Sequence, residues 1–198
     1  MSLELDRNRV IGRGSSRSCF RHPFEKSRCV KVEKRDYLKI TREEIKYYKR
    51  FQKRGISWDM LARFHGTVET DLGEGAVFDM PHDYDGGISR TLDHYLHAQS
   101  IPAGELGKAL RAFKDYMKQE RIVVRELKAD NLVFQRSSRS LGKIVLVDGL
   151  GNNEFFPFAN YSRFFAWRML HKKWQKFKNS LLKNYPGNAL TKDLASML

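Results

Sequence analysis

Short β-rich runs separated by glycine-containing turns occur within the first 80 residues. Such runs are typical of β-strands. A glycine turn divides residues 10–20 into two such runs, and residues 28–33 form a third. A second glycine-containing turn divides residues 64–80 into two more. The pattern therefore predicts a five-stranded antiparallel sheet in the N-terminal part of the chain.

Residues 41–54 follow a helical period instead, in which Ile45 and Tyr48 share one face. Glu44 stands three residues after Thr41, which is the spacing of a capping box. We expect one helix between the third and fourth strands, with Thr41 as its N-cap. Glu44 would either fold back to cap the helix or pair with Lys31.

The helical period returns in the second half of the chain. Residues 91–96 predict a short helix and residues 102–120 a longer one. Two apolar runs, residues 121–134 and 143–151, then resemble strands. The longer helix has an apolar stripe that is most simply a core-facing stripe. It consists of Leu106, Leu110, Phe113 and Met117.

Length and composition are those of a globular protein. The chain has 198 residues, 41% of them hydrophobic, which is enough to bury a core in about one to one-and-a-half ordinary domains. No run of about 18 apolar residues is present and the N-terminus lacks a signal-peptide core, so we expect a cytoplasmic protein without a transmembrane segment. With two cysteines and no CxxC or HExxH spacing, neither a disulfide scaffold nor a protein-built zinc site is expected.

The formal net charge of +14 predicts an anionic partner. Nucleotides, phospholipid headgroups, phosphorylated glycans and nucleic acids all fit, and charge does not choose among them. Nucleic acid ranks lowest, because no recognition module accompanies the basic residues. In the acidic loop at residues 82–87, Asp83 and Asp85 are expected to mark a solvated turn.

The tail from Phe155 to Lys192 contains no acidic residue, and its apolar positions recur every three or four residues. In one interpretation this apolar face packs on the domain and the lysines are solvated. In the other, a basic aromatic helix contacts an anionic glycan or the surface of the inner membrane. The apolar positions are Trp167, Leu170, Trp174, Phe177 and Leu181.

Residues that could bind phosphate or its magnesium ion occur in both halves of the chain. Gly12 and Gly14 lie in the first turn, where a missing Cβ lets backbone amides approach phosphate oxygens, although a plain hairpin is the simpler interpretation. Lys31, inside an apolar strand, would either extend to solvent from a sheet edge or reach nucleotide phosphates. Asn131 and Asp148 lie in the two later apolar runs, as the magnesium-binding residues of kinase-like sites do.

These motifs carry a resemblance. Residues 125–131, Arg-Glu-Leu-Lys-Ala-Asp-Asn, resemble the HRDLKxxN loop of protein-kinase-like enzymes, and residues 147–151, Val-Asp-Gly-Leu-Gly, resemble the DFG region. More narrowly, most of residues 9–180 is similar to the bacterial PhoP-regulatory-network family of YrbL-like proteins. The further motifs that carry this similarity are Lys46-Tyr-Tyr48, Tyr84-Asp-Gly86 and, most specifically, the HGTVET run of residues 65–70.

The resemblance implies an α+β, protein-kinase-like bilobal fold near the lipopolysaccharide-core kinases, and a link to envelope stress regulation. Residues 1–198 would form a single kinase-like domain. Its N-lobe, a five-stranded antiparallel sheet with one helix, would cover about residues 1–80, with a hinge at 79–87 and a reduced helical C-lobe at 88–198. The implied cofactors are ATP and Mg²⁺.

The resemblance also implies roles for single residues. Lys31 would hold the phosphates and Glu44 would pair with that lysine, with Glu43 as the alternative if the register differs by one. Asn131 and Asp148 would bind Mg²⁺.

In the catalytic loop, Lys128 would neutralise the γ-phosphate in the transition state. Glu126 stands where the loop has its aspartate, so it is the candidate proton acceptor, one methylene longer than usual. The reference pKa values of Glu and Asp, about 4.3 and 3.9, are similar, so the replacement changes mainly geometry.

Cys19 falls at the valine of the GxGxxGxV loop and Cys29 at the alanine of the AxK strand, so both would cover adenine as small apolar residues. Asp79 and Met80 would offer backbone groups to adenine at the hinge. Arg17 replaces the third glycine of the loop, which is a departure from the kinase pattern.

Gly149 replaces the phenylalanine of DFG, no APE-like motif follows, and fewer than 50 residues remain after Gly151. We therefore expect phosphotransfer to a non-protein acceptor such as a small molecule, a glycan or an envelope glycolipid. Two alternatives stay open: a nucleotide-binding pseudokinase that regulates a partner, and a basic adaptor at an anionic membrane surface.

Overall fold

The protein divides into two compact units in a computed structural model that describes residues 2–8, 10–14, 16–34, 38–151 and 163–198. The N-terminal unit comprises Met1–Trp58 and Ala62–Pro81, and the C-terminal unit comprises Asp59–Leu61 and His82–Leu198. Each unit is described by itself. The division after Pro81 falls inside the range predicted for the hinge, residues 79–87.

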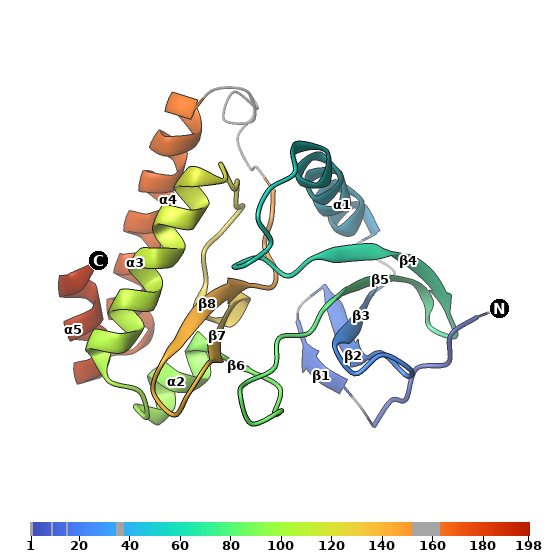
Figure 1. Cartoon of the computed structure of the whole chain (residues 1–198), viewed down its shortest axis with the longest axis horizontal. Coiled ribbons are helices and arrows are strands. Elements are labelled where there is room, and N and C mark those ends of the chain that lie inside the picture. Colours follow the sequence, from blue (N-terminus) through green and yellow to red (C-terminus); the bar gives the residue numbers. More distant parts are fainter. Residues whose placement is uncertain (1, 9, 15, 35–37, 152–162) are drawn as a thin grey trace. The chain divides into compact units, whose positions relative to one another are not determined.

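The N-terminal unit is built on an antiparallel sheet with the order β1-β2-β3-β5-β4 (Figure 1). The helix α1, Leu38–Arg54, connects β3 to β4 and lies on one face of this sheet. The prediction of a five-stranded antiparallel sheet with one helix is therefore confirmed for this unit. The strands are β1 Val10–Arg13, β2 Arg17–Arg21, β3 Arg28–Glu33, β4 Phe64–Thr70 and β5 Gly73–Asp79.

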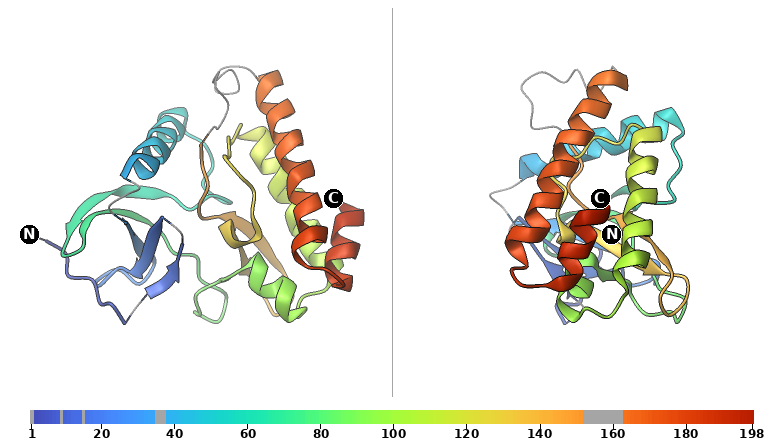
Figure 2. Two further views of the ribbon diagram at one scale, coloured as in Figure 1. Left: turned by 180° about the vertical axis from the view of Figure 1, so that it is seen from behind. Right: turned by 90° about the vertical axis from the view of Figure 1, so that its left-hand side faces the viewer.

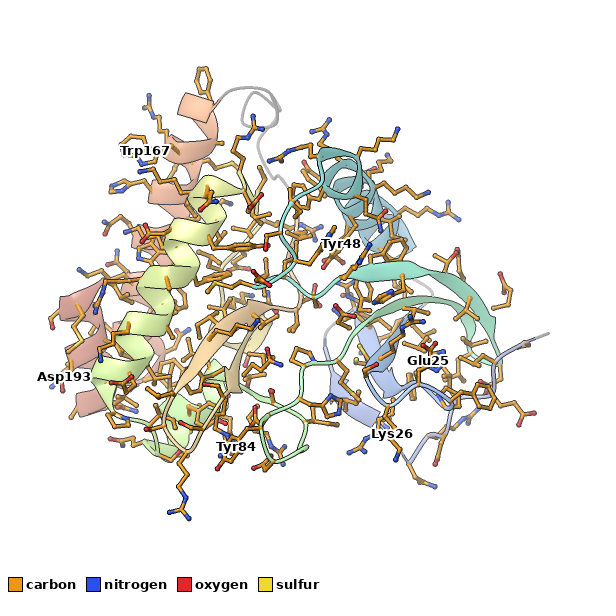
Figure 3. All side chains as sticks on the ribbon, in the orientation of Figure 1. Glu25, Lys26, Tyr48, Tyr84, Trp167 and Asp193 are labelled. Atoms are coloured by element: carbon orange, nitrogen blue, oxygen red, sulfur yellow. The ribbon has the colours of Figure 1, made fainter. Side chains whose placement is uncertain are left out.

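The two faces of this sheet bury different side chains, as the strand period requires. One face carries a hydrophobic cluster that includes Phe20, Val30 and Val32, together with Leu5 from the N-terminal segment. On the other face, Tyr48 of α1 packs between the helix and the strands (Figure 3), with ring centroids 5.8 Å from Phe64 and 5.1 Å from Phe78. Aromatic pairs in such tilted arrangements contribute about 0.5–1.5 kcal/mol beyond area burial. They fix α1 against β4 and β5, and β5 pairs with β3, the strand that carries the candidate lysine.

One detail of α1 differs from the prediction. The helix begins at Leu38, so Thr41 lies inside its first turn and is not the N-cap. The amide of Thr41 instead donates a hydrogen bond to Oε1 of Glu33 at 2.8 Å. Because a first-turn amide has no partner within its own helix, a carboxylate from β3 can satisfy it as well as a cap would. The capping-box role of Glu44 is wrong for the same reason.

The C-terminal unit joins a small antiparallel sheet of order β6-β7-β8 to a group of helices (Figure 2). Helices α3, α4 and α5 lie side by side in both figures, and α3 also packs against β8. The elements are β6 Arg90–Thr91, α2 Leu92–Ala98, α3 Ala103–Gln119, the 3₁₀ turn η2 Ala129–Asn131, β7 Leu132–Arg136, β8 Gly142–Leu146, α4 Arg163–Asn184 and α5 Ala189–Met197.

The two helices predicted from the helical period, at residues 91–96 and 102–120, are present as α2 and α3. Thr91 caps α2 by accepting a hydrogen bond from the amide of His94 at 3.3 Å. The whole predicted stripe of α3 is buried, so its interpretation as core is confirmed.

The apolar run at residues 121–134 is a strand only in its last part. Ile122, Val123 and Val124 are buried, yet only Val124 forms a bridge, with Leu150, and β7 begins after Asn131. Buried apolar runs fit irregular core segments as well as strands, and periodicity does not separate the two. Asn131 thus lies just before β7, as the last residue of the 3₁₀ turn η2.

The acidic loop is also more ordered than predicted. Asp83 is buried and accepts hydrogen bonds from the Ser89 hydroxyl and from Nε of Arg136, both at 2.6 Å. Arg136 also reaches the Asp85 carboxylate at 2.8 Å. The prediction of a solvated turn was wrong for Asp83, because an arginine distant in sequence meets it.

The basic tail packs on its own unit. In α4 the side chains of Leu170, Trp174, Phe177 and Leu181 are buried, which supports the packing interpretation for these four. Trp167 is 47% exposed and points outward near the start of the helix (Figure 3). Among the described residues, no helix is long and apolar enough to span a bilayer.

Candidate functional site

Lys31 occupies the middle strand of the five-stranded sheet, on the face that carries α1. By strand register it stands between Cys19 of β2 and Ala76 of β5. Only 8% of the residue is exposed, and its Nζ lies 4.5 Å from the centroid of the Phe78 ring. A cation over an aromatic face recovers part of the hydration it loses. Lys31 is thus held inside the unit and does not extend to solvent from a sheet edge.

A small pocket opens beside Lys31 between α1 and the strands. Thr41 and Ile45 of α1 line it together with Thr67 and Ala76 of the sheet. Its charged lining residues are Lys31 and Arg42 on one side of the balance and Glu33 and Glu74 on the other. Two cations and two carboxylates therefore meet at this pocket.

Glu44 points inward from α1 and is 1% exposed. Its Oε2 lies 2.6 Å from Nη1 of Arg17, which is also buried. Glu43, in contrast, is exposed and pairs with Lys46. The structure therefore favours Glu44 over Glu43 as the functional glutamate. The pairing of Glu44 with Lys31 stays a prediction.

The pair between Arg17 and Glu44 was not predicted from the sequence. Arg17 stands at the third glycine position of the presumed phosphate loop, where a ligand-facing or solvent-facing arginine would be expected. Instead the strand register places Arg17 opposite Glu33, at the end of the sheet where α1 begins. Only a three-dimensional contact could reveal this partner, because residues 17 and 44 belong to separate elements.

The glycine turn is a β-hairpin, as its simpler interpretation held. The amide of Gly14 donates to the carbonyl of Arg17 at 2.8 Å. A Cβ added at Gly12 would meet nothing within 4 Å, and one at Gly14 would meet only the Arg17 carbonyl, at 3.4 Å. Packing of the described residues therefore does not demand glycine at either position. A closely approaching ligand would explain both.

The presumed adenine-facing residues are close together in the N-terminal unit. The Cys29 thiol is buried, forms a hydrogen bond with the Cys19 thiol, and lies 3.9 Å from the Asp79 carbonyl. The hydrogen bond with Cys19 and then burial raise the pKa of Cys29 well above its ordinary value. The strand register places the two cysteines diagonally on one face of the sheet, and their role as adenine-covering residues stays a prediction.

The backbone amides at the presumed hinge already have partners. Met80 donates to the Ser27 carbonyl at 2.8 Å and Asp79 to the Arg63 carbonyl at 3.0 Å. The Asp79 carboxylate lies 2.6 Å from Nε2 of His65, so this histidine has a structural partner. An adenine that used these two amides would have to displace their present acceptors.

In the C-terminal unit, Asn131 and Asp148 are brought to neighbouring positions. Asn131 ends η2, and its carbonyl accepts a hydrogen bond from the amide of Val147 at 2.9 Å. Asp148 follows directly and accepts from the amide of Gly149 at 2.6 Å through Oδ1. An amide and a carboxylate supply the oxygen ligands that Mg²⁺ prefers.

Gly149 is the feature that sequence reasoning undervalued. Its φ is +89°, and a Cβ there would lie 2.8 Å from Nδ2 of Asn131 and 3.1 Å from the Glu126 carbonyl. No other residue fits without displacing the candidate magnesium ligand or the catalytic loop. What the sequence presented as a missing phenylalanine is a glycine that this packing requires. The neighbouring glycine, Gly151, was the available signal of an unusual backbone.

Backbone hydrogen bonds hold the two segments around Gly149 together. The amide of Arg125 donates to the Gly149 carbonyl at 2.8 Å, and the amide of Gly151 donates to the Val123 carbonyl at 3.2 Å. Lys173 of α4 donates to the Arg125 carbonyl from the other side. The basic tail helix therefore supports the loop that carries Glu126.

Glu126 and Lys128 flank the buried Leu127 and project outward. Their side chains are 59% and 55% exposed, and Nζ of Lys128 lies 3.0 Å from Oε2 of Glu126. An exposed pair of this kind contributes about 0.2–1 kcal/mol, so it can separate at little cost. Both groups are accessible to a ligand.

Among the described residues, no cluster of three or more His, Cys, Asp or Glu side chains could hold a metal ion by itself. Magnesium is usually bound by one or two protein carboxylates together with substrate phosphates and water. Asp148 and Asn131 fit that role as a partial set of ligands.

Comparisons with known proteins agree on one family. Residues 3–182 match the family described as PhoP regulatory network protein YrbL. A protein of Escherichia coli (strain K12) called Uncharacterized protein YrbL is 32% identical over 182 residues, which are 88% of this chain and 86% of the relative. A protein of Shigella flexneri with the same name matches with the same identity and coverage. The matched region contains all twelve candidate residues.

Proposed function

The chain belongs to the PhoP-regulatory-network YrbL family, and from this premise we propose that it is an ATP- and Mg²⁺-dependent phosphotransferase with a protein-kinase-like fold. The observation that carries the proposal is the arrangement of Asn131 and Asp148 around Gly149. The backbone has a positive φ at Gly149, and a Cβ at that residue would crowd the Asn131 side-chain amide and the Glu126 carbonyl. A purely structural turn has no evident need for both ligands beside such a glycine.

The N-terminal unit supports the nucleotide half of the proposal. Burying a lysine in a central strand is costly, and Lys31 lies beside a pocket where phosphate oxygens would offset that cost. The open space at Gly12 suits the same ligand. In this proposal Lys31 holds phosphates, and Cys19 and Cys29 cover the base.

In the C-terminal unit, Asp148 and Asn131 would hold Mg²⁺, which when bound neutralises charge on the transferred phosphoryl group. Lys128 contributes a further positive charge. Glu126 accepts the proton of the acceptor hydroxyl after separating from Lys128. Phosphoryl transfer depends chiefly on positioning and charge, so a glutamate in place of aspartate is compatible with turnover.

We propose a non-protein acceptor, such as a small molecule or an envelope glycolipid on the cytoplasmic side of the inner membrane. The net charge of +14 favours an anionic acceptor. The place of the family near lipopolysaccharide-core kinases remains part of this proposal.

A nucleotide-binding pseudokinase is the second candidate. The observation in its favour is that several catalytic groups have other partners: Glu44 pairs with Arg17, and Glu126 with Lys128. Such a protein would bind ATP and regulate a partner without transferring phosphate.

The test is binding of ATP with and without Mg²⁺, followed by calorimetry and thermal shift together with a hydrolysis assay. We expect Mg²⁺-dependent binding and slow turnover in the wild type, and loss of the Mg²⁺ dependence in Asp148→Ala. Asp193→Ala, which removes an exposed aspartate of α5 (Figure 3), is the matched control and should behave as wild type.

Absence of nucleotide binding in the wild type would refute both candidates. Binding without any hydrolysis or transfer would favour the pseudokinase, and Glu126→Gln would then have no further effect.

A further inference from the structure

Helix α4 has two faces, and only one of them packs on its own unit. The helix lies against α3 and α5, and the side chains that it buries include Leu170, Trp174 and Phe177. The exposed positions between residues 165 and 183 cover about half of the helix circumference. Packing within the unit explains the buried stripe but not the composition of this outward face.

The outward face of α4 is cationic. Four exposed side chains lie within about 80° of one another around the helix axis and extend over about 22 Å along it: Arg168, Lys172, Lys176 and Lys183. The chain has no acidic residue between Phe155 and Lys192, so α4 supplies no carboxylate to neutralise them. A row of this length fits an extended anionic surface better than a single phosphate ion.

Two aromatic side chains are exposed near the beginning of the same face. Phe165 is 44% and Trp167 47% exposed. The Trp167 ring stacks on the ring of His171, with centroids 5.9 Å apart, and points outward (Figure 3). Because His171 already covers one face of this indole, insertion between lipids suits it better than stacking on a nucleobase. Amphipathic aromatic rings are also enriched at the headgroup level of bilayers.

We propose that the outward face of α4 docks on the surface of a bilayer that contains anionic phospholipids. The four cations contact lipid phosphates, while Phe165 and Trp167 enter the headgroup region. Each basic residue close to an anionic bilayer strengthens binding about fivefold. The docking is held by side chains of one helix and is therefore peripheral and reversible.

A consequence of docking rests on the proposed function. Lys173 of α4 donates a hydrogen bond to the Arg125 carbonyl, in the loop that carries Glu126. A helix bound to lipid would hold this loop near the headgroups. That position suits an acceptor hydroxyl carried by a glycolipid.

The docking itself can be tested without any nucleotide, by co-sedimentation of the full chain with vesicles. We expect binding to phosphatidylcholine vesicles that contain roughly one-third phosphatidylglycerol, weakening as salt is raised, and no binding to phosphatidylcholine alone. The double variant Lys172→Glu, Lys176→Glu should bind about tenfold more weakly or worse. Lys49→Glu, Lys53→Glu makes the same change of charge at exposed positions of α1 and is the matched control, which should bind nearly as tightly as wild type.

Trp167 reports the docking directly. Of the other two tryptophans, Trp58 is half-buried and stacks on Tyr48, and Trp174 is fully buried. Brominated lipids in the anionic vesicles should quench the tryptophan emission of the wild type. The quenching should be lost in Trp167→Phe, which keeps an aromatic ring at this position.

Equal losses of vesicle binding in the α4 and α1 double variants would overturn the proposal, because net charge alone would then explain the attraction. Quenching that persists in Trp167→Phe would also overturn it, since the contact would lie elsewhere. Binding of an RNA oligonucleotide through Lys172 and Lys176, without binding to vesicles, would assign the face to nucleic acid instead.

The docking and the proposed function fail separately. Vesicle binding by a protein that does not bind ATP would refute the proposed function while the docking stands. ATP binding without vesicle binding at low salt would refute the docking alone.

Discussion

The charged candidates Lys31 and Glu44 of the N-terminal unit are buried, whereas Glu126 and Lys128 of the C-terminal unit face solvent. Glu44 and Arg17 are an internal ion pair, and Lys31 lies over an aromatic ring. The ion pair between Glu126 and Lys128 is exposed to solvent. The fold thus depends on the buried groups of the N-terminal unit and not on Glu126 and Lys128. Substitutions of the buried groups should consequently change stability and function together. Substitutions of Glu126 or Lys128 should change function without a comparable change in stability.

The largest expected effect belongs to Glu44→Ala. Removing one partner of a buried ion pair leaves the Arg17 charge uncompensated, which typically costs about 3–5 kcal/mol. We expect the free energy of unfolding, measured by urea denaturation, to fall by about this amount. Glu43→Ala removes the exposed neighbour in the same helix and should cost about 1 kcal/mol or less. Equal losses in the two variants would contradict the structural role of the Arg17–Glu44 pair.

Gly149→Ala is expected to have the next largest effect. The new Cβ would collide with the Asn131 amide and the Glu126 carbonyl, and the left-handed backbone adds strain of about 1–3 kcal/mol. Gly187→Ala is the matched control, because Gly187 also has positive φ but nothing within 4 Å of an added Cβ. The difference between the two variants isolates the collision. Magnesium-dependent nucleotide binding should be lost in Gly149→Ala alone; its retention there would show that the Asn131–Asp148 arrangement is not a magnesium site.

The contrast between the units also shows what the sequence could and could not predict. The sheet and the α3 stripe follow from local periods, so Leu106 and Phe113 were placed in the core from spacing alone. Arg17–Glu44 and Asp83–Arg136 join distant segments, and no local pattern encodes such partners. Thr41 was misplaced because a carboxylate from β3 replaced the cap that the sequence suggested.

The candidate site was predictable to a different degree in each unit. Motif resemblance located Lys31, Asn131 and Asp148, since their spacing survives in the sequence. It did not show that Gly149 is required by packing, because its φ and its distance to Asn131 exist only in the folded chain. Nor did it show that the Met80 amide already has an acceptor.

Lys128→Ala should change stability by about 1 kcal/mol or less, because the exposed pair with Glu126 contributes little. If Lys128 neutralises the γ-phosphate, turnover should fall at least tenfold while ATP affinity changes much less, which single-turnover kinetics would separate. Lys108→Ala removes an exposed lysine from a comparable pair with Glu105 in α3 and is the control. A parallel fall in both variants would indicate a general charge effect instead of a specific role.

Gly12→Ala is expected to have the smallest effect on stability, within about 0.5 kcal/mol, because an added methyl meets no described atom within 4 Å. Its effect on nucleotide binding should be disproportionate, since a ligand lying against the turn would occupy that space. Gly75→Ala in the same sheet is the opposite case, because its Cβ would lie 2.5 Å from Cγ1 of Val30 and should destabilise the unit. If Gly12→Ala binds ATP as tightly as wild type, the turn is a hairpin without a phosphate-binding role, and the site must depend on Lys31 and the C-terminal residues. If Gly12→Ala binds ATP more weakly while its free energy of unfolding is unchanged, the ligand occupies the space next to Gly12.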